Sequence, residues 1–219
     1  PAAAKLETLC EEGGFTEGAA VGPDHSMYFS DFAQPFNARP ARIMKFNPKT
    51  GKTAIHCADS KMGNGLMFDS TGRLVACCAS PLGGARALVE ITADGKVKPI
   101  VEKFKGKRFN SPNDVAVRSD GTLWFTDPPW GLTGPHEIPG HWVYKLDPKT
   151  GKVDVVHKYL AMLNGIVFSP DETRIYIADT GDHKRHPDPK FHKLPASIQC
   201  HELGDDGKLG KKLFHIDAG

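Results

Sequence analysis

The sequence predicts an all-β protein built from repeated units of four antiparallel strands. Three observations lead to this prediction: one short pattern recurs at regular spacing, strand and turn signals follow each recurrence, and no segment shows helical periodicity over three turns. Each occurrence has a polar residue, an apolar run, a turn and a second apolar run. The four occurrences are Glu17 to Asp31, Asn64 to Cys78, Asn113 to Asp127 and Asn164 to Asp179.

The repeat measures about 50 residues, because the leading residues of the four segments lie 47, 49 and 51 positions apart. Each unit opens with a predicted hairpin; in the third unit, residues 115–117 and 123–125 are apolar and rich in β-branched or aromatic residues, and residues 118–121 form the turn. A second hairpin follows in every unit. Its predicted turns are Asn47 to Gly51, Ala93 to Gly95, Asp147 to Gly151 and Gly204 to Gly207.

Four-stranded units of about 50 residues are typical of β-propeller blades. We predict blades at about residues 12–59, 60–107, 108–160 and 161–219 of a single domain, preceded by a short strand at Leu6–Cys10. The fourth unit already has four strands, so this first strand lacks an evident partner. Either four blades close with a spare strand outside, or the given sequence stops before the final blades.

The leading residue of each unit is a candidate ligand. A propeller places Glu17, Asn64, Asn113 and Asn164 at one end of its central channel, where they should converge. Carboxylate and amide oxygens suit Ca²⁺, Mg²⁺ or Mn²⁺ better than a structural zinc site. Asparagine before Gly or Asp is also a common turn residue, so each amide taken alone is compatible with a purely structural role.

Loops after the second strand of each unit should flank the same channel mouth. They bring Trp130 to the predicted pocket, where its ring could stack on a sugar-like ring or simply pack on its neighbours. The loop after the fourth unit's first hairpin brings His183 as a further candidate substrate contact. His183, His186 and His192 also suggest a metal cluster, but the intervening charged and proline residues favour an exposed loop instead.

Composition excludes several classes of protein. Lys and Arg number 28 against 26 Asp and Glu, and the basic residues are scattered, so we expect no nucleic-acid partner. No apolar stretch approaches the roughly 18 residues of a transmembrane helix, and we expect no membrane insertion. The sequence has neither a Gly-x-Ser-x-Gly elbow nor a Walker loop. The sequence leaves the oligomeric state open. It also leaves the compartment open: we expect a soluble protein that is either cytoplasmic or, after removal of a signal peptide, periplasmic.

At these positions the chain resembles the gluconolactonase and regucalcin (senescence marker protein) family. The matching motifs are Phe15-Thr16-Glu17-Gly18, Gly63-Asn64-Gly65-Leu66, Asn110-Ser111-Pro112-Asn113-Asp114, Phe125-Thr126-Asp127-Pro128-Pro129 and Leu163-Asn164-Gly165-Ile166. The resemblance implies a six-bladed propeller, of which this chain contains about four blades. It also implies one divalent metal on the axis, Ca²⁺ first, with Zn²⁺, Mn²⁺ or Mg²⁺ as alternatives.

The resemblance assigns Glu17 and Asn164 as metal ligands, and Asn113 as a ligand or substrate contact. It implies a further aspartate in a later blade, beyond residue 219, so the catalytic base is not identified in this sequence. Asn64 is a weaker pocket candidate, and Asp127 is expected to be structural because Asp31 and Asp179 share its place in the repeat.

The implied activity is ring-opening hydrolysis of a sugar-type lactone, a small-molecule substrate, with the cation activating carbonyl and water. The alternative is a metal- or sugar-binding propeller without turnover. A protein-interaction propeller explains the repeat but not the polar residues at the channel mouth.

Overall fold

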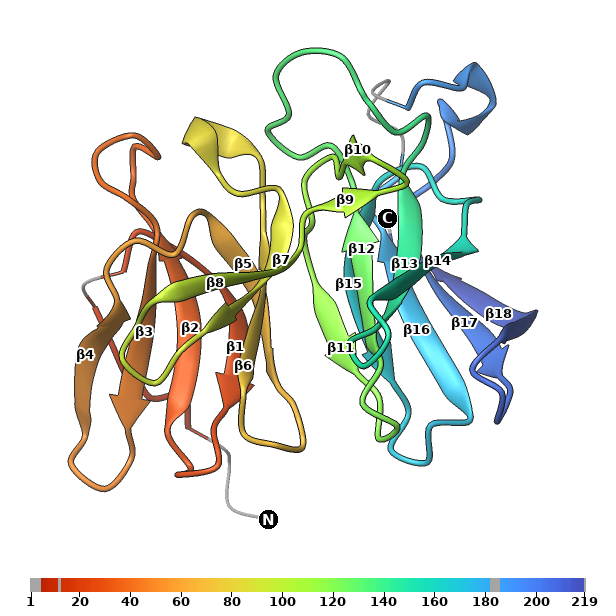
Figure 1. The fold of residues 1–219 in the computed structure, drawn as a ribbon. Helices are drawn as coiled ribbons and strands as arrows, with labels where there is room; N and C mark the ends of the chain where they lie inside the picture. Colours follow the sequence, from red (N-terminus) through yellow and green to blue (C-terminus); the bar gives the residue numbers. More distant parts are fainter. Residues whose placement is uncertain (1–4, 12, 182–185, 219) are drawn as a thin grey trace.

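The computed structural model describes residues 5–11, 13–181 and 186–218, and its regular secondary structure is almost entirely β-strand (Figure 1). Two short 3₁₀ turns, η1 (Pro81–Gly83) and η2 (Pro189–Phe191), are the only helical elements of the described residues. The predicted all-β class and the four-stranded antiparallel blades are therefore confirmed.

The strands form four sheets in chain order. Blade 1 comprises β1 (Phe15–Val21), β2 (Met27–Phe32), β3 (Arg42–Asn47) and β4 (Lys52–Cys57). Blade 2 comprises β5 (Gly63–Phe68), β6 (Leu74–Cys78), β7 (Ala87–Ile91) and β8 (Val97–Val101). Blade 3 comprises β11 (Val115–Val117), β12 (Leu123–Asp127), β13 (Trp142–Asp147) and β14 (Lys152–His157). Blade 4 comprises β15 (Leu163–Phe168), β16 (Arg174–Asp179), β17 (Ser197–Leu203) and β18 (Leu209–Asp217).

Every blade has its strands in sequence order, each paired antiparallel with the next. The turns join the expected strands: Asn47 to Gly51 connects β3 to β4, and Asp147 to Gly151 connects β13 to β14. One element was not predicted from the sequence. A two-stranded ribbon, β9 (Lys103–Phe104) and β10 (Lys107–Arg108), lies in the connection between blades 2 and 3.

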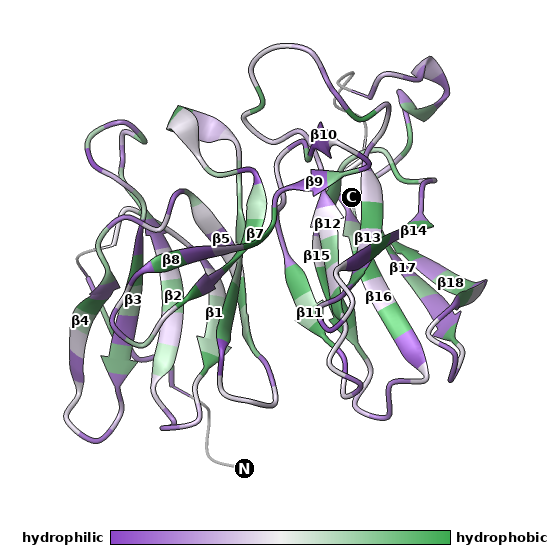
Figure 2. Cartoon of the chain, in the orientation of Figure 1, coloured by the Kyte–Doolittle hydropathy of each residue, from purple (hydrophilic) through white to green (hydrophobic). Residues whose placement is uncertain are grey.

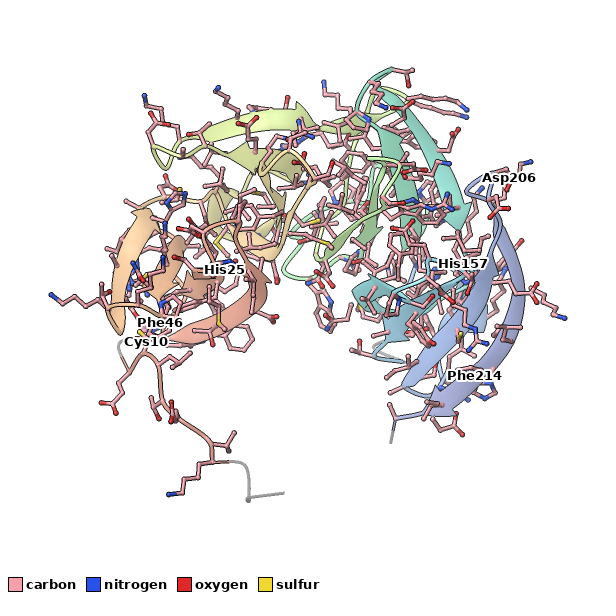
Figure 3. All side chains as sticks on the ribbon, turned by 90° about the horizontal axis from the view of Figure 1, so that it is seen from below. Cys10, His25, Phe46, His157, Asp206 and Phe214 are labelled. Carbon is pink, nitrogen blue, oxygen red and sulfur yellow. The ribbon has the colours of Figure 1, made fainter. Side chains whose placement is uncertain are left out.

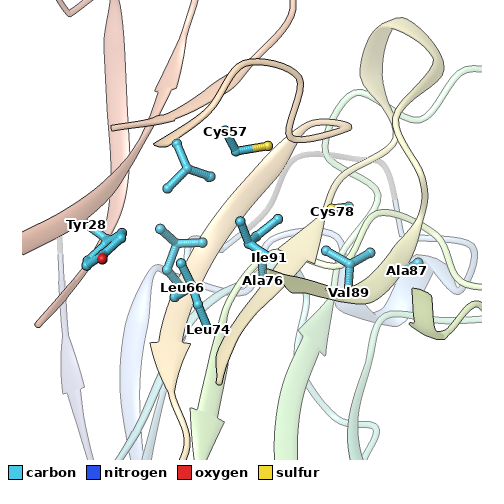
Figure 4. Packing of buried hydrophobic residues seen from close by; sticks show 10 residues of the cluster. Tyr28, Cys57, Leu66, Leu74, Ala76, Cys78, Ala87, Val89 and Ile91 are labelled. Atoms are coloured by element: carbon cyan, nitrogen blue, oxygen red, sulfur yellow. The ribbon is translucent and has the colours of Figure 1, made fainter. Parts of the chain in front are cut away.

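The hydrophobic core lies between blades, because alternate residues of a strand point to opposite faces of its sheet. In β6, Leu74, Ala76 and Cys78 pack toward blade 1, whereas Val75 and Cys77 pack toward blade 3. Figure 4 shows the first of these interfaces at close range. Figure 2 shows the same pattern across the molecule, with apolar residues along the strands and hydrophilic residues in the turns.

The four blades lie side by side along an arc, with blade 1 at one end and blade 4 at the other (Figure 3). Blades 1 and 4 each keep apolar side chains exposed: Val21 and Ile55 on the first, Val167 and Ile216 on the fourth, each exposed by more than half. Sheets in a propeller normally cover one another, so these two blades present faces suited to further blades.

The predicted strand at Leu6–Cys10 is wrong. These residues form no strand, and Leu6 is fully exposed. Their contact with blade 1 includes a 3.3 Å hydrogen bond from the Thr53 hydroxyl to the Leu9 carbonyl oxygen. An apolar alternation of five residues needs a neighbouring sheet edge to become a strand, and none of the described strands pairs with this segment. The described residues also contain no helix long and apolar enough to span a bilayer.

Candidate metal and substrate pocket

In blades 1, 2 and 4 the leading residue lies where the innermost strand is irregular. The β1–β2 register shifts between Glu17 and Ala20, and the pairing of β15 with β16 shifts between Leu163 and Ile166. Blade 2 has the same irregularity around Asn64. Bulges of this kind turn a side chain out of the sheet and are frequent beside functional sites. The repeated residue-plus-glycine motif therefore turns the leading side chain away from the regular pleat.

Hydrogen bonds between blades hold these positions in place. The Ser30 hydroxyl donates to the Asn64 carbonyl oxygen at 2.6 Å, and the Thr126 hydroxyl donates to the Asn164 carbonyl oxygen at 2.8 Å. Between blades 2 and 3, the Gly65 N–H donates to the Asn113 carbonyl oxygen at 2.7 Å. Each link joins the leading residue of one blade to the blade before it, so the positions are fixed relative to one another.

All four leading residues line one cavity of about 530 Å³. Its lining comprises Phe15, Glu17, Phe32, Phe36, Met62, Asn64, Ala79, Pro81, Leu82, Asn113, Trp130, Gly131 and Asn164. The sequence predicted six metal or substrate contacts. Five of them line this cavity: the four leading residues and Trp130. The structure brings these five together, and their roles as ligands or substrate contacts stay predictions. His183 lies outside the described residues.

The amide groups of this pocket are available to a ligand. Asn64, Asn113 and Asn164 use their backbone atoms in the hydrogen bonds between blades, and no described residue hydrogen-bonds their amides. Asn113 is nevertheless 6% exposed. Its amide atoms are not among the fully buried polar atoms that lack a partner, so they are open to the cavity, where a ligand can bond them.

Glu17 supplies the carboxylate of the pocket. Burial raises its pKa, and the nearby carboxylate of Asp114 raises it further. A cation at Glu17 would oppose both effects, because a positive charge favours the ionised carboxylate.

Asp114 was not recognised from the sequence as part of the site. It stands where the other three blades have glycine, directly after the leading residue. Its two carboxylate oxygens accept hydrogen bonds at 2.9 Å from the N–H groups of Val115 and Ile166, so it connects blade 3 to the bulge of blade 4. Burial raises the pKa of Asp114, and these two donors lower it. The glycine-to-aspartate change within the repeat was the available signal.

The glycine after Glu17 has a strict steric role, which gives a testable prediction. Gly18 has a φ of +54°, and a Cβ added to it would lie 2.1 Å from the Asn64 carbonyl oxygen. Gly51 has a φ of +64° with nothing within 4 Å of such a Cβ. We expect Gly51→Ala to lower the free energy of unfolding by about 1 kcal/mol. Gly18→Ala should lower it by about 3 kcal/mol, because a backbone clash is added to the same strain.

Urea titration of both variants measures the two values. If both variants lose the same free energy of unfolding, the backbone at Asn64 moves away from the added Cβ at no cost, and the predicted clash between blades 1 and 2 is wrong.

The repeated aspartates are structural, as expected for Asp127. The Asp127 carboxylate is fully buried and accepts hydrogen bonds from the N–H groups of Asn110 at 2.9 Å and Ser111 at 2.8 Å. Asp179 accepts in the same way from Ala161 and Met162, both at 2.8 Å. Each of these carboxylates fixes the segment that leads into the first strand of its blade.

Blade 1 and blade 2 vary this arrangement. Asp31 accepts from the Gly14 N–H and also pairs with Arg39 and Arg42, both at 2.6 Å. In blade 2 the equivalent residue is Cys78, whose thiol donates to the Ser60 carbonyl oxygen at 3.2 Å. The cysteine therefore replaces one internal hydrogen bond with another and brings no ionised group to the pocket.

Trp130 is held firmly at the pocket wall. Its indole N–H donates to the Leu163 carbonyl oxygen at 3.1 Å, and its own carbonyl oxygen accepts from the Ser111 hydroxyl at 2.6 Å. Beside it, Gly131 packs so closely on Pro81 that a Cβ there would lie 2.2 Å from the proline ring. The apolar residues Phe36, Met62 and Leu82 were missed from the sequence, because only the folded chain brings their loops to the channel mouth.

The expectation that the three loop histidines are exposed is wrong for His186. It is 7% exposed and packs against Phe191 and His141, with ring centroids 4.1 Å and 4.5 Å away. This packing has no local signal in the sequence, because His141 belongs to the connection between β12 and β13. Among the described residues, no group of three His, Cys, Asp or Glu side chains is arranged to hold a metal ion.

Burial of His141 predicts acid sensitivity. This side chain is fully buried with its Nδ1 2.5 Å from the Ala161 carbonyl oxygen, and burial lowers its pKa to about 3, with smaller contributions from His186 and His136. In the unfolded chain the pKa of this histidine is about 6.5. Below that pH the unfolded chain binds a proton that the folded chain does not bind, so the free energy of unfolding falls as the pH falls. At pH 5 the loss from this one group is about 2 kcal/mol.

Melting temperatures at pH 7.5 and pH 5 measure the effect. We expect a smaller difference between the two pH values in His141→Gln than in the unsubstituted protein, whatever the stability of the variant at pH 7.5. An unchanged difference would place the acid-sensitive group elsewhere.

Comparison with known proteins places this chain in a family. The family model described as the SMP-30/Gluconolactonase/LRE-like region matches residues 15–186. A gluconolactonase of Zymomonas mobilis is 32% identical over 164 residues, which are 66% of this chain and 45% of that protein. The lactonohydrolase oryL of Aspergillus oryzae is 32% identical over 221 residues, which are 90% of this chain and 47% of that protein.

Solved structures agree in fold. A gluconolactonase from Xanthomonas campestris superposes with a TM-score of 0.76 at 29% identity, covering 94% of this chain and 63% of that one. A calcium-binding regucalcin from Agrobacterium tumefaciens gives a TM-score of 0.64 at 21% identity, covering 93% of this chain and 60% of that one, and shows the fold alone. The chain spans about half the length of the curated relatives it matches.

Proposed function

Because the chain belongs to the SMP-30/gluconolactonase/LRE-like family, we propose that the whole protein is a divalent-metal-dependent lactonase acting in the channel-mouth pocket. The observation that carries the proposal is the convergence of Glu17, Asn64, Asn113 and Asn164 on one cavity. The names of the gluconolactonase and lactonohydrolase relatives support a lactone as the substrate.

The residues present fit a hard cation. We assign Glu17 and Asn164 as ligands and Asn113 as a ligand or substrate contact, with Asn64 as a further pocket contact. One carboxylate and neutral amide oxygens without Cys or His favour Ca²⁺, with Mn²⁺, Mg²⁺ or Zn²⁺ as alternatives. Support for the fit comes from the amides, which no described residue hydrogen-bonds. The proposed set would accept a further aspartate from a later blade, as the family resemblance implies.

The chemistry divides between the cation and the chain. A bound divalent ion supplies Lewis acidity toward the lactone carbonyl and acidifies water. The amide N–H groups of Asn64 and Asn113 can donate to the substrate oxygens and orient the ring, while Trp130 and the apolar lining exclude bulk water. The proton of the attacking water goes to a carboxylate at the pocket, and the implied aspartate is our candidate.

A non-catalytic metal- or sugar-binding propeller is the second candidate. It is favoured by the state of the two described carboxylates nearest the channel. Asp114 is occupied by two backbone donors, and Glu17 is assigned to the cation. Neither is free to act as the general base in that arrangement.

Initial rates of lactone hydrolysis distinguish the two functions. The full-length protein is treated with a chelator and assayed on glucono-1,5-lactone and dihydrocoumarin, with the spontaneous rate subtracted, before and after re-addition of Ca²⁺, Mn²⁺, Mg²⁺ or Zn²⁺. A rate lost on chelation and restored by one ion supports the lactonase. Ion binding without turnover on either lactone supports the binding protein.

A further inference from the structure

We propose that the preferred lactone carries an aryl or alkyl substituent and is not a polyhydroxylated sugar lactone. This inference rests on the proposed lactonase function and specifies its substrate class. It starts from the distribution of polar and apolar groups around the cavity.

Within the described lining, the polar side chains are confined to the leading residues of the four blades. Glu17 and the three asparagines are the only side chains in the described lining with oxygen or amide nitrogen atoms, apart from the indole N–H of Trp130. That N–H is already used by the Leu163 carbonyl oxygen. A sugar lactone has a hydroxyl on most ring carbons, and each buried hydroxyl without a partner weakens binding. A lactone carbonyl and ring oxygen alone need far fewer donors.

The rest of the wall is apolar and aromatic. Phe15, Phe32 and Phe36 form a triad in which the ring centroids of every pair are 5.9 to 6.1 Å apart. Phe15 and Phe36 remain 44% and 45% exposed although they belong to this cluster. An exposed aromatic group beside convergent polar residues is typical of a ligand pocket that buries apolar surface.

Leu82, in the loop after β6, also lines the cavity. It lies in η1 with a φ of +52° and a ψ of +34°, a left-handed conformation that disfavours residues with a side chain. Its side chain is 60% exposed and lines the cavity. A leucine in a strained conformation that buries little of its side chain contributes little to the stability of the fold. Its position at the pocket therefore points to contact with a ligand.

The wall is also fixed before any ligand arrives. The Trp130 carbonyl oxygen is tied to Ser111, which also accepts a 2.8 Å hydrogen bond from the Ser80 N–H just before η1. Gly131 packs directly on Pro81, the first residue of η1. The Trp130 loop and the Leu82 turn therefore form one rigid apolar surface, which favours rigid apolar substituents such as an aryl ring.

The test compares kcat/KM of the full-length, ion-loaded protein for glucono-1,5-lactone, dihydrocoumarin and δ-decalactone. We expect kcat/KM to be at least tenfold higher for the two apolar lactones. Equal or higher kcat/KM for glucono-1,5-lactone overturns the inference and leaves the lactonase function intact. Absence of turnover on all three lactones with every ion overturns the lactonase function, and the inference with it.

Leu82→Gly separates recognition from structure. Glycine relieves the left-handed strain, so the free energy of unfolding should stay the same or rise, while KM for dihydrocoumarin rises about tenfold and kcat changes little. The control is Leu213→Ser on β18, a partly exposed leucine outside the pocket, which should leave KM unchanged. A purely structural Leu82 would instead lower stability and leave the ratio between apolar and sugar lactones unchanged.

Discussion

Glu17→Gln should reduce metal-dependent lactone hydrolysis by roughly a thousandfold or more while leaving the melting temperature nearly unchanged. Glutamine keeps the size of the side chain but removes the only charge that the described pocket lining offers to a cation. Burial and Asp114 raise the pKa of Glu17, so a neutral side chain is well tolerated by the fold. The measurement is kcat/KM at saturating ion, together with the affinity for the ion by calorimetry.

Glu102→Gln is the matched control. Glu102 is exposed in the connection between β8 and β9 and lies outside the pocket, so its variant should retain both activity and ion affinity. Unchanged kcat/KM in Glu17→Gln, at full ion affinity, would remove Glu17 from the metal site.

Asp127→Ala should destabilise the protein by about 3 to 5 kcal/mol, the largest effect on stability that we expect from one substitution. The substitution leaves the buried N–H groups of Asn110 and Ser111 without acceptors. Typical domains have only about 5 to 15 kcal/mol of stability, so most of it would be lost. Urea titration of the purified variant gives the value directly.

Asp205→Ala provides the comparison, because Asp205 is exposed in the turn between β17 and β18. It should change stability by no more than about 0.5 kcal/mol. A loss as small as this in Asp127→Ala would mean that water enters and satisfies the two N–H groups, contrary to the structural role given to the repeated aspartates.

The blades could be predicted from the sequence because each strand pair is local. Apolar alternation and turn residues lie within one unit, as in β12 and the turn at residues 118–121, and the repeat confirms each signal four times. The Leu6–Cys10 segment shows the limit of this reasoning. Its alternation matches that of a strand, but a strand also needs a free sheet edge, which depends on the arrangement of the whole chain.

The polar half of the site was also predictable, because Glu17, Asn64, Asn113 and Asn164 share one repeat position. The apolar half was not. Phe36, Met62 and Leu82 lie in irregular connections, where no period relates one blade to another. Asp114 and His141 were missed for a related reason: their partners, Ile166 and His186, lie in the next blade. Contacts between blades have no signature in a single unit.

The most direct test of this account is the position of the metal in crystals of the full-length protein grown with Mn²⁺, located by anomalous scattering. We predict a single strong peak within coordinating distance of the Glu17 carboxylate and the Asn164 amide oxygen, and loss of that peak in Glu17→Gln. A protein that binds Mn²⁺ in solution but shows no peak between these two residues, or a peak beside His141 and His186 instead, would contradict the account.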